Sequence, residues 1–458
     1  MKSFLKRQIK SEESDIKNIW RRIRTRDFSG NTGMAVKNSV YNFSTTLISK
    51  FGSLLFVVIL ARLLMPELFG LYNLALSTIL IFAAISELGI GQAIIRFVSH
   101  SLGKNNKKKA KNYMIYLGKI KFLLTFLSVL LLLIFSKFIA ETYYQKPIFL
   151  ALLAGVFYIS FVRIVSFLNS ILNSFNNFRN VLFKETLFQI SRIILVPLIV
   201  VYAMKLSLSD ELILFYLILA LAISYLLTGA YLLFVTKKKS YLKPKGSGSL
   251  SKEDKKDVNR FVLLTAVISL SGVFFGNIDK IMLGRFVAGE FIGYYQAAFS
   301  LITALTSLSA FGAVLLPIFS RMENKDRNRA MRKTIRLVFL ISTGVFAATL
   351  IFSHLAILII FGSEYLLATN ILRLFSILIL ILPVIGIYLP YFMSENRPEI
   401  IAKSLGLSTL LNIALNYILI TSLLQFGQLQ AVYGAAIATI ISQGVYLGML
   451  VWWKKWKR

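Results

Sequence analysis

Residues 51–95 read FGSLLFVVILARLLMPELFGLYNLALSTILIFAAISELGIGQAII, and this stretch decides the fold. Two apolar runs of about 20 residues, each long enough to cross a bilayer as a helix, flank a short polar turn. Residues 274–318, FFGNIDKIMLGRFVAGEFIGYYQAAFSLITALTSLSAFGAVLLPI, repeat the pattern 223 positions later. Biased composition explains chance leucine matches, but it does not readily place four distinctive residues at one offset, so we infer an internal repeat. The matched pairs are Arg62 with Arg285, Glu67 with Glu290, Gly70 with Gly293, and Tyr72 with Tyr295.

Composition places the whole chain in a membrane. Of its 458 residues 57% are apolar and only 16% are charged, and the mean hydropathy is +0.71. Soluble domains are about half apolar and a quarter charged, so a set of soluble domains is excluded. Twelve apolar segments are predicted to span: 42–61, 71–95, 114–136, 148–169, 187–204, 212–235, 261–283, 293–318, 334–353, 371–392, 404–424 and 431–453.

The placement of the basic residues tests this span count. Arginine and lysine concentrate in cytoplasmic loops of membrane proteins. With twelve spans, 42 of the 52 basic residues fall in alternate loops and tails, and only 5 fall in the loops between them. Both termini are therefore predicted to be cytoplasmic. The net charge of +32 then reflects orientation and attraction to anionic membrane lipid rather than nucleic-acid binding.

The repeat predicts an all-α polytopic membrane protein with twelve transmembrane helices in two parallel six-helix lobes. An even number of spans per half makes both halves enter from the same side, related by a pseudo-two-fold axis along the membrane normal. Secondary transporters use this arrangement, with the substrate between the two bundles. The expected regions are a basic tail 1–41, an N-lobe 42–236, a basic linker 237–260, a C-lobe 261–453 and a basic tail 454–458.

The tail 1–41 has two interpretations. Apolar residues at helical spacing, with basic residues between them, are typical of a short amphipathic helix on the inner leaflet. A disordered basic tail is equally compatible with the sequence. The apolar positions are Ile16, Ile19, Trp20 and Ile23.

The motifs of both repeats resemble a known family. The stretch ARLLMPELFGLY at 61–72, followed by LGIG at 88–91, looks like the first two spans of the Wzx-type polysaccharide-biosynthesis flippases. These belong to the multidrug/oligosaccharidyl-lipid/polysaccharide exporter superfamily. NIDKIMLGR at 277–285, followed by GYY at 293–295, is similar to that family's seventh span and following loop.

The resemblance implies two six-helix, MATE-like lobes in a V around a central cavity, in the cytoplasmic membrane. It also implies an alternating-access flippase that moves a prenyl-pyrophosphate-linked oligosaccharide from the inner to the outer leaflet. That unit would belong to an O-antigen, capsule, exopolysaccharide or S-layer glycan, carried on an undecaprenyl or dolichyl chain. The expected partners are this lipid, anionic membrane lipid, a polymerase and other glycan-assembly proteins, with the chain itself a monomer.

Seven ionisable residues lie inside the predicted spans, where charge is costly and usually functional. Five are cationic and two are acidic, and this excess suits an anionic group such as a pyrophosphate. Arginine can engage phosphate oxygens in pairs. Lys50 and Arg163 are the first candidates to bind the pyrophosphate, followed by Arg192 and Arg373.

The remaining three, Glu87, Asp279 and Lys280, are assigned to a coupling-ion site or an intramembrane ion pair. Asp279 is expected either to pair with Lys50 or Arg163 across the lobes or to bind a coupling ion or proton. Glu87 is expected to be a cation ligand or a partner of Arg96. Arg163 and Arg192 have a second interpretation, as residues reaching toward the cytoplasmic surface.

The sequence argues against enzymes. It contains no GxxxxGK[ST], HExxH or GxSxG motif, no cysteine and only two histidines, so no cofactor or metal centre is expected. Coupling to a Na⁺ or H⁺ gradient stays open.

Two other functions are alternatives to the flippase: a cation-coupled multidrug exporter of the same superfamily, and a polysaccharide polymerase. The cationic excess disfavours the first, and the short outer loops disfavour the second.

Overall fold

The computed structural model describes residues 30–238, 249–308, 319 and 322–456. The regular elements in these ranges are all helices. The expected amphipathic segment at 16–23 and residues 239–248 of the linker lie outside the described residues. In chain order the helices are α2 (Gly30–Ile85), α3 (Ile90–Gly103), α4 (Lys107–Lys137), η1 (Phe138–Tyr144), α5 (Phe149–Ser174), α6 (Phe178–Lys205), α7 (Asp210–Lys238), α8 (Lys252–Phe286), α9 (Gly289–Leu308), α11 (Asn324–Ile360), η2 (Ser363–Tyr365), α12 (Ala368–Phe375), α13 (Leu378–Ser394), α14 (Pro398–Leu424) and α15 (Gln428–Lys455).

Helix α2 is two helices joined by a kink. Its 56 residues would extend about 84 Å if straight, far beyond a hydrocarbon core of about 30 Å. Met65 leaves the helical region, with φ 58° and ψ 171°. The cause is Pro66, whose ring disfavours helical backbone at the residue before it. The kink therefore separates the first two predicted spans, 42–61 and 71–95.

A second break interrupts the predicted span 71–95, between α2 and α3. Residues 86–89 form turns, and Leu88 and Gly89 have φ of 33° and 74°. A side chain at Gly89 would be strained by this φ and would also meet Thr265 Oγ1 of α8 at 2.0 Å. Position 89 therefore requires glycine for two reasons, its φ and its close contact with Thr265. The contact also shows that the break lies against a helix of the second half.

Nine helices of the described part of the chain are long and apolar enough to cross a membrane, or ten if α12 and α13, bent by 42°, form one span. Helix α2 counts once in this number despite its kink, and α9 is not among the nine. An all-helical membrane fold is therefore confirmed. The count of twelve spans in two lobes of six stays a prediction.

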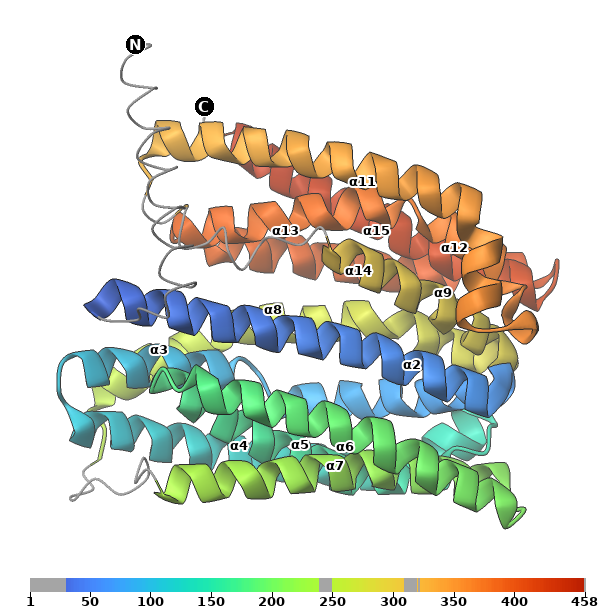
Figure 1. The fold of residues 1–458 in the computed structure, drawn as a ribbon, viewed down its shortest axis with the longest axis horizontal. Coiled ribbons are helices and arrows are strands. Elements are labelled where there is room, and N and C mark those ends of the chain that lie inside the picture. Colours follow the sequence, from blue (N-terminus) through green and yellow to red (C-terminus); the bar gives the residue numbers. More distant parts are fainter. Residues whose placement is uncertain (1–29, 239–248, 309–318, 320–321, 457–458) are drawn as a thin grey trace.

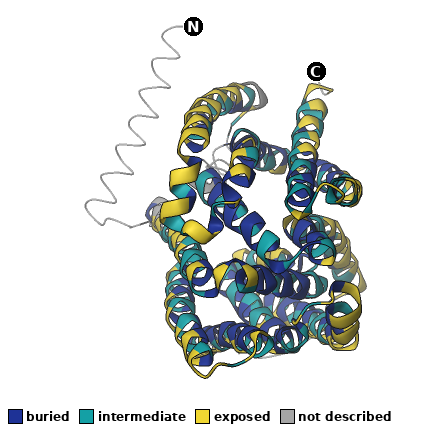
Figure 2. Cartoon of the chain, turned by 90° about the vertical axis from the view of Figure 1, so that its right-hand side faces the viewer, coloured by how far each residue is buried: buried dark blue, intermediate teal, exposed yellow. Residues whose placement is uncertain are grey.

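Helices α3–α7 lie on one side of α2, and α11–α15 lie on the other (Figure 1). Helix α8 runs beside α2 (Figure 1) and contacts both α2 and α14. Figure 2 shows buried residues gathered between the helices and exposed residues on their outward turns. Many exposed positions on α4 and α11 are large and apolar, as expected where a surface meets lipid.

At one end of the molecule, equivalent residues of the two repeats touch one another. Gly70 of α2 lies so close to Gly289 and Gly293 of α9 that a Cβ would sit 1.8 Å from the Gly289 carbonyl oxygen. Beside this crossing, Glu67 Oε2 accepts a hydrogen bond of 2.8 Å from the backbone N–H of Glu290. Both Gly70–Gly293 and Glu67–Glu290 are separated by 223 residues, the offset of the sequence repeat.

Two equivalent arginines reach across the same end in opposite directions. Arg62 Nε donates to the Ile360 carbonyl at 2.9 Å, and its Nη2 donates to that of Ile359, at the end of α11. Arg285 Nη1 donates to the Tyr143 carbonyl of η1 at 2.7 Å. Each arginine thus binds the end of a helix in the other half. We call these contacts, with the Glu67 and Gly70 contacts, the end closure.

At the other end, the start of α8 is held by the first half. Asp254 pairs with Lys109 at 2.8 Å and accepts from Tyr113 Oη at 2.9 Å, both on α4. The Arg96 guanidinium lies 4.6 Å from the Phe261 ring centroid. Helix α8 therefore contacts the first half at both ends, α3 and α4 where it begins and η1 where it ends. This end, which carries the lysine-rich α3–α4 turn, is called the basic end.

Candidate functional site

Glu87 lies in the break between α2 and α3, and three side chains surround its carboxylate. Oε2 accepts from Arg163 Nη1 at 2.6 Å, Lys121 Nζ at 3.0 Å and Ser166 Oγ at 3.1 Å. Lys121 Nζ also donates to Ser166 at 3.0 Å. Lys121 comes from α4, and Arg163 and Ser166 come from α5. We call these four residues the Glu87 cluster.

The Glu87 cluster carries one net positive charge, because one carboxylate faces two cations. The Lys121 and Arg163 side chains are only 4% and 13% exposed. Arg163 Nε is buried and has no hydrogen-bond partner among the described residues. Both cations lie near the middle of long helices, so the alternative that Arg163 reaches the cytoplasmic surface is wrong.

Two sequence expectations for this region need correction. Arg96 was the expected partner of Glu87, but its guanidinium lies over the rings of Phe97 and Phe261 instead. Lys121 is not among the seven intramembrane residues that the sequence analysis singles out. Its position inside the apolar run 114–136 was the signal that could have identified it.

Arg192, in the middle of α6, points into a small polar pocket of the first half. Its Nη2 donates to Ser53 Oγ of α2 at 2.8 Å and its Nε donates to Gln189 Oε1 at 2.9 Å. The rings of Phe56 and Phe188 lie 4.7 and 5.0 Å from its Cζ. No carboxylate pairs with it among the described side chains. The pocket measures about 270 Å³ and is lined by α2, α5, α6 and α7.

Lys50 precedes Ser53 by three residues on α2, so both lie on one side of that helix. Lys50 is exposed and makes no ion pair or hydrogen bond with any described residue. It was the first candidate for a pyrophosphate ligand, and its ammonium group is free to take that role. Arg163 and Lys50 are not brought into contact.

Asp279 of α8 is buried and surrounded by neutral donors from three other helices. Oδ2 accepts from Tyr295 Oη at 2.5 Å and Thr439 Oγ1 at 2.6 Å, and Oδ1 accepts from Asn416 Nδ2 at 2.6 Å. Asn412 Nδ2 lies 3.4 Å from Thr439 Oγ1. The Asn412 and Asn416 amide oxygens are buried and lack hydrogen-bond partners within the described ranges. We call these five residues the Asp279 cluster.

The expected pairing of Asp279 with Lys50 or Arg163 is wrong. Neutral donors from its own half occupy both oxygens, and Arg163 pairs with Glu87 instead. Lys280 forms no ion pair in the described part of the chain, and its Nζ donates to Gln296 Oε1 at 3.1 Å. Sequence reasoning missed Asn412, Asn416 and Thr439, although two asparagines four residues apart in an apolar run were a visible signal.

Arg373 lies on α12 and forms no hydrogen bond or ion pair with the described residues of either cluster. Its Nε donates to Ser353 Oγ at 2.9 Å and its Nη1 to Asn370 Oδ1 at 3.2 Å. The four cationic candidates therefore do not form one constellation. Lys50 and Arg192 share one region of α2 and α6, Arg163 belongs to the Glu87 cluster, and Arg373 stands apart.

Comparisons with known proteins agree with the membrane fold. Residues 35–323 match the model of a family described as "Polysaccharide biosynthesis protein". The chain is 23% identical over 406 residues to an uncharacterized membrane protein, MJ1068, of Methanocaldococcus jannaschii, covering 84% of this chain and 76% of that protein. It is 30% identical over 190 residues to a probable low-salt glycan biosynthesis flippase, Agl15, of Haloferax volcanii, covering 40% of this chain and 38% of that one.

Solved structures share the architecture at low identity. The lipid II flippase MurJ in an inward closed conformation superposes with a TM-score of 0.67 at 17% identity, over 90% of this chain and 87% of that one. An inward-facing multidrug resistance MATE family transporter of the MOP superfamily gives 0.65 at 15% identity, over 87% and 93%. These likenesses show the fold. The relatives with stated functions are flippases and transporters, and none is described as an enzyme, as the sequence predicted.

Proposed function

Because the chain belongs to the polysaccharide biosynthesis protein family, we propose that it is a flippase that moves a prenyl-pyrophosphate-linked oligosaccharide from the inner to the outer leaflet. The observation that carries the proposal is the uncompensated positive charge at mid-membrane depth in the first half. Lys121 and Arg163 share the single carboxylate of Glu87, and Arg192 forms no ion pair with a described carboxylate, because Glu185 in its pocket pairs with Lys184. Burying such an excess is costly unless an anionic group completes the site.

The pyrophosphate would bind near Lys50 and Arg192, neither of which forms an ion pair with a described carboxylate. Glu185 also lines the Arg192 pocket, but its carboxylate pairs with Lys184 at 2.8 Å. Arg192 is already oriented by Ser53, Gln189 and two aromatic rings. Arg163 would then support the site from the Glu87 cluster, and Arg373 is the weakest of the four candidates. The sugars would lie between the halves while the prenyl chain stays in lipid.

Alternating access would open and shut the end closure. The closure is made of a few hydrogen bonds to backbone atoms and one glycine crossing, which can separate without unfolding either half.

A coupling cation, Na⁺ or H⁺, would bind the Asp279 cluster, which offers a carboxylate and two amide oxygens that accept no hydrogen bond from the described residues. Hard cations prefer such oxygen ligands. We also propose a monomer that works beside a polymerase and other glycan-assembly proteins.

The test is complementation of a strain that lacks its own lipid-linked oligosaccharide flippase. Arg192→Ala and Lys50→Ala, made separately, should abolish surface glycan, because each removes a charge that would hold the pyrophosphate. Arg192→Lys should rescue partly. Lys205→Ala, at the end of α6, is the matched control and should complement fully at equal expression. Full complementation by both alanine variants would contradict the site assignment.

The Asp279 cluster also favours a second function, a cation-coupled multidrug exporter. Such a protein would confer drug resistance that Asp279→Asn abolishes, without any effect on surface glycan. A flippase coupled through the same cluster would instead lose glycan export in Asp279→Asn. Measuring both traits in one host separates the two proposals.

A further inference from the structure

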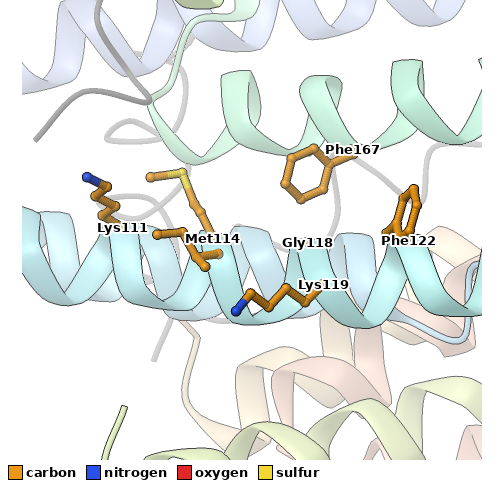
Figure 3. A pocket seen from close by; sticks show the side chains of 7 residues that line it. Lys111, Met114, Gly118, Lys119, Phe122 and Phe167 are labelled. Atoms are coloured by element: carbon orange, nitrogen blue, oxygen red, sulfur yellow. The ribbon is translucent and has the colours of Figure 1, made fainter. Parts of the chain in front are cut away.

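A groove of about 570 Å³ runs between α4 and α5 on the outside of the first half. Met114, Ile115 and Phe122 of α4 line it together with Phe167 of α5. Figure 3 shows Phe167 facing α4 across Gly118. Its volume lies within the range of sites that hold ligands of a few dozen heavy atoms. The groove belongs to neither of the two clusters described above.

Gly118 creates the depth of this groove. A Cβ at this position would lie 3.1 Å from Phe167 Cζ, so a larger side chain would close the space between the two helices. The walls are exposed apolar side chains: Phe122 is 76% and Ile115 is 40% exposed. A chain of apolar residues on a membrane helix faces lipid, so the natural occupant is an acyl chain.

Two lysines give the groove a charge preference. Lys111 and Lys119 also line it, about 12 Å apart along α4 at 1.5 Å per residue. Their stems can lie on the apolar walls while their ammonium groups point toward the basic end. No acidic residue lines the groove in the described structure. It starts beside the basic end, where Lys107, Lys108 and Lys109 begin α4.

We infer that this groove binds one anionic phospholipid, with an acyl chain between α4 and α5 and the phosphate held by Lys111 and Lys119. Charge complementarity selects this occupant over a zwitterionic lipid, since lysines near a membrane surface attract anionic headgroups. The inference does not depend on the transported substrate, because none of the residues invoked belongs to the Glu87 cluster, the Arg192 pocket or the Asp279 cluster.

The experiment is native mass spectrometry of the full chain in detergent, titrated with phosphatidylglycerol or with phosphatidylcholine of identical chains. The wild type should retain one phosphatidylglycerol more tightly than phosphatidylcholine. Lys111→Gln/Lys119→Gln should weaken phosphatidylglycerol binding about tenfold or more, and Lys111→Arg/Lys119→Arg should restore it. Gly118→Leu should weaken both lipids, because it fills the groove.

Lys107→Gln/Lys108→Gln is the matched control, with the same loss of charge on the same helix but outside the groove. Its binding should stay within about twofold of the wild type. An equal loss in this control, equal retention of the two lipids, or tighter retention of a prenyl phosphate than of phosphatidylglycerol would each overturn the inference. Thermal unfolding of every variant in the same detergent checks that lost binding does not reflect lost folding.

Discussion

At the scale of single residues, the Glu87 carboxylate holds two mid-membrane cations together. Removing one member of a buried ion pair costs more than the pair contributes, because the remaining charge stays buried without a partner. In this cluster, loss of the Glu87 carboxylate would leave the positive charges of Lys121 and Arg163 close together without a negative charge between them.

Glu87→Gln should therefore lower the free energy of unfolding by about 3–5 kcal/mol. The measurement is denaturant or thermal unfolding of the purified protein in detergent. Glu141→Gln is the control, because Glu141 only meets Lys137 at 4.0 Å on an exposed surface, where the loss should stay below about 1 kcal/mol. Equal effects of the two substitutions would show that Glu87 does not organise a buried cluster.

Residues also mark the limit of what the sequence could predict. Charged residues inside apolar runs, such as Arg163 and Asp279, are visible without a structure because charge at bilayer depth is rare. Partners such as Ser166 and Thr439 are not visible, because they are ordinary residues in apolar helices. The Asp279 cluster draws on four helices, and no spacing along the chain encodes that meeting.

At the scale of elements, the break between α2 and α3 places Glu87 on non-helical backbone between two helices. Such backbone survives in a membrane only where protein or a cavity covers it. Here Thr265 of α8 covers Gly89, and the turn presents the Glu87 carboxylate to α4 and α5. The glycine at 89 was a sequence hint of a kink, but its contact with the other half was not predictable.

Gly89→Ala should destabilise the protein by about 2–4 kcal/mol, from the left-handed φ and from the contact with Thr265 together. Unfolding in detergent measures this loss. Gly103→Ala is the matched control at the end of α3, where a Cβ meets no atom within 4 Å, and it should be neutral or slightly stabilising. Tolerance of Gly89→Ala would mean that the break is not rigid.

At the scale of the whole molecule, the end closure is the contact that alternating access must break. The chain contains no cysteine, so Glu67→Cys with Glu290→Cys can be joined by a short bifunctional maleimide without background. Joining them should stop transport in proteoliposomes, while each single variant and the unlinked pair should stay active. A pair within one helix region, Lys137→Cys with Glu141→Cys, should be harmless when joined. Unchanged transport by the joined Glu67–Glu290 pair would exclude opening at this end.

The orientation of the molecule follows from its charge pattern and is also open to test. Lys104→Cys at the α3–α4 turn should react with an impermeant maleimide only in permeabilised cells. Lys205→Cys at the end of α6 should react in intact cells. The reverse result would invert the predicted topology, although the helices themselves would stay as described.

The all-helical membrane fold was the easiest part to predict, because long apolar runs are linear signals. The kink at Met65 was predictable only in part. Pro66 indicates a bend, but the sequence does not show that the helix on both sides of the bend contacts the second half.

The two arginines of the end closure bind carbonyl oxygens and not side chains. Every residue has a carbonyl, so positions 143, 359 and 360 can accept almost any amino acid without loss of the contact. Only the arginines themselves are constrained. The two copies of a duplicated sequence could thus diverge at these acceptor positions while the contacts between them persisted, as long as each copy kept its arginine, at 62 and at 285.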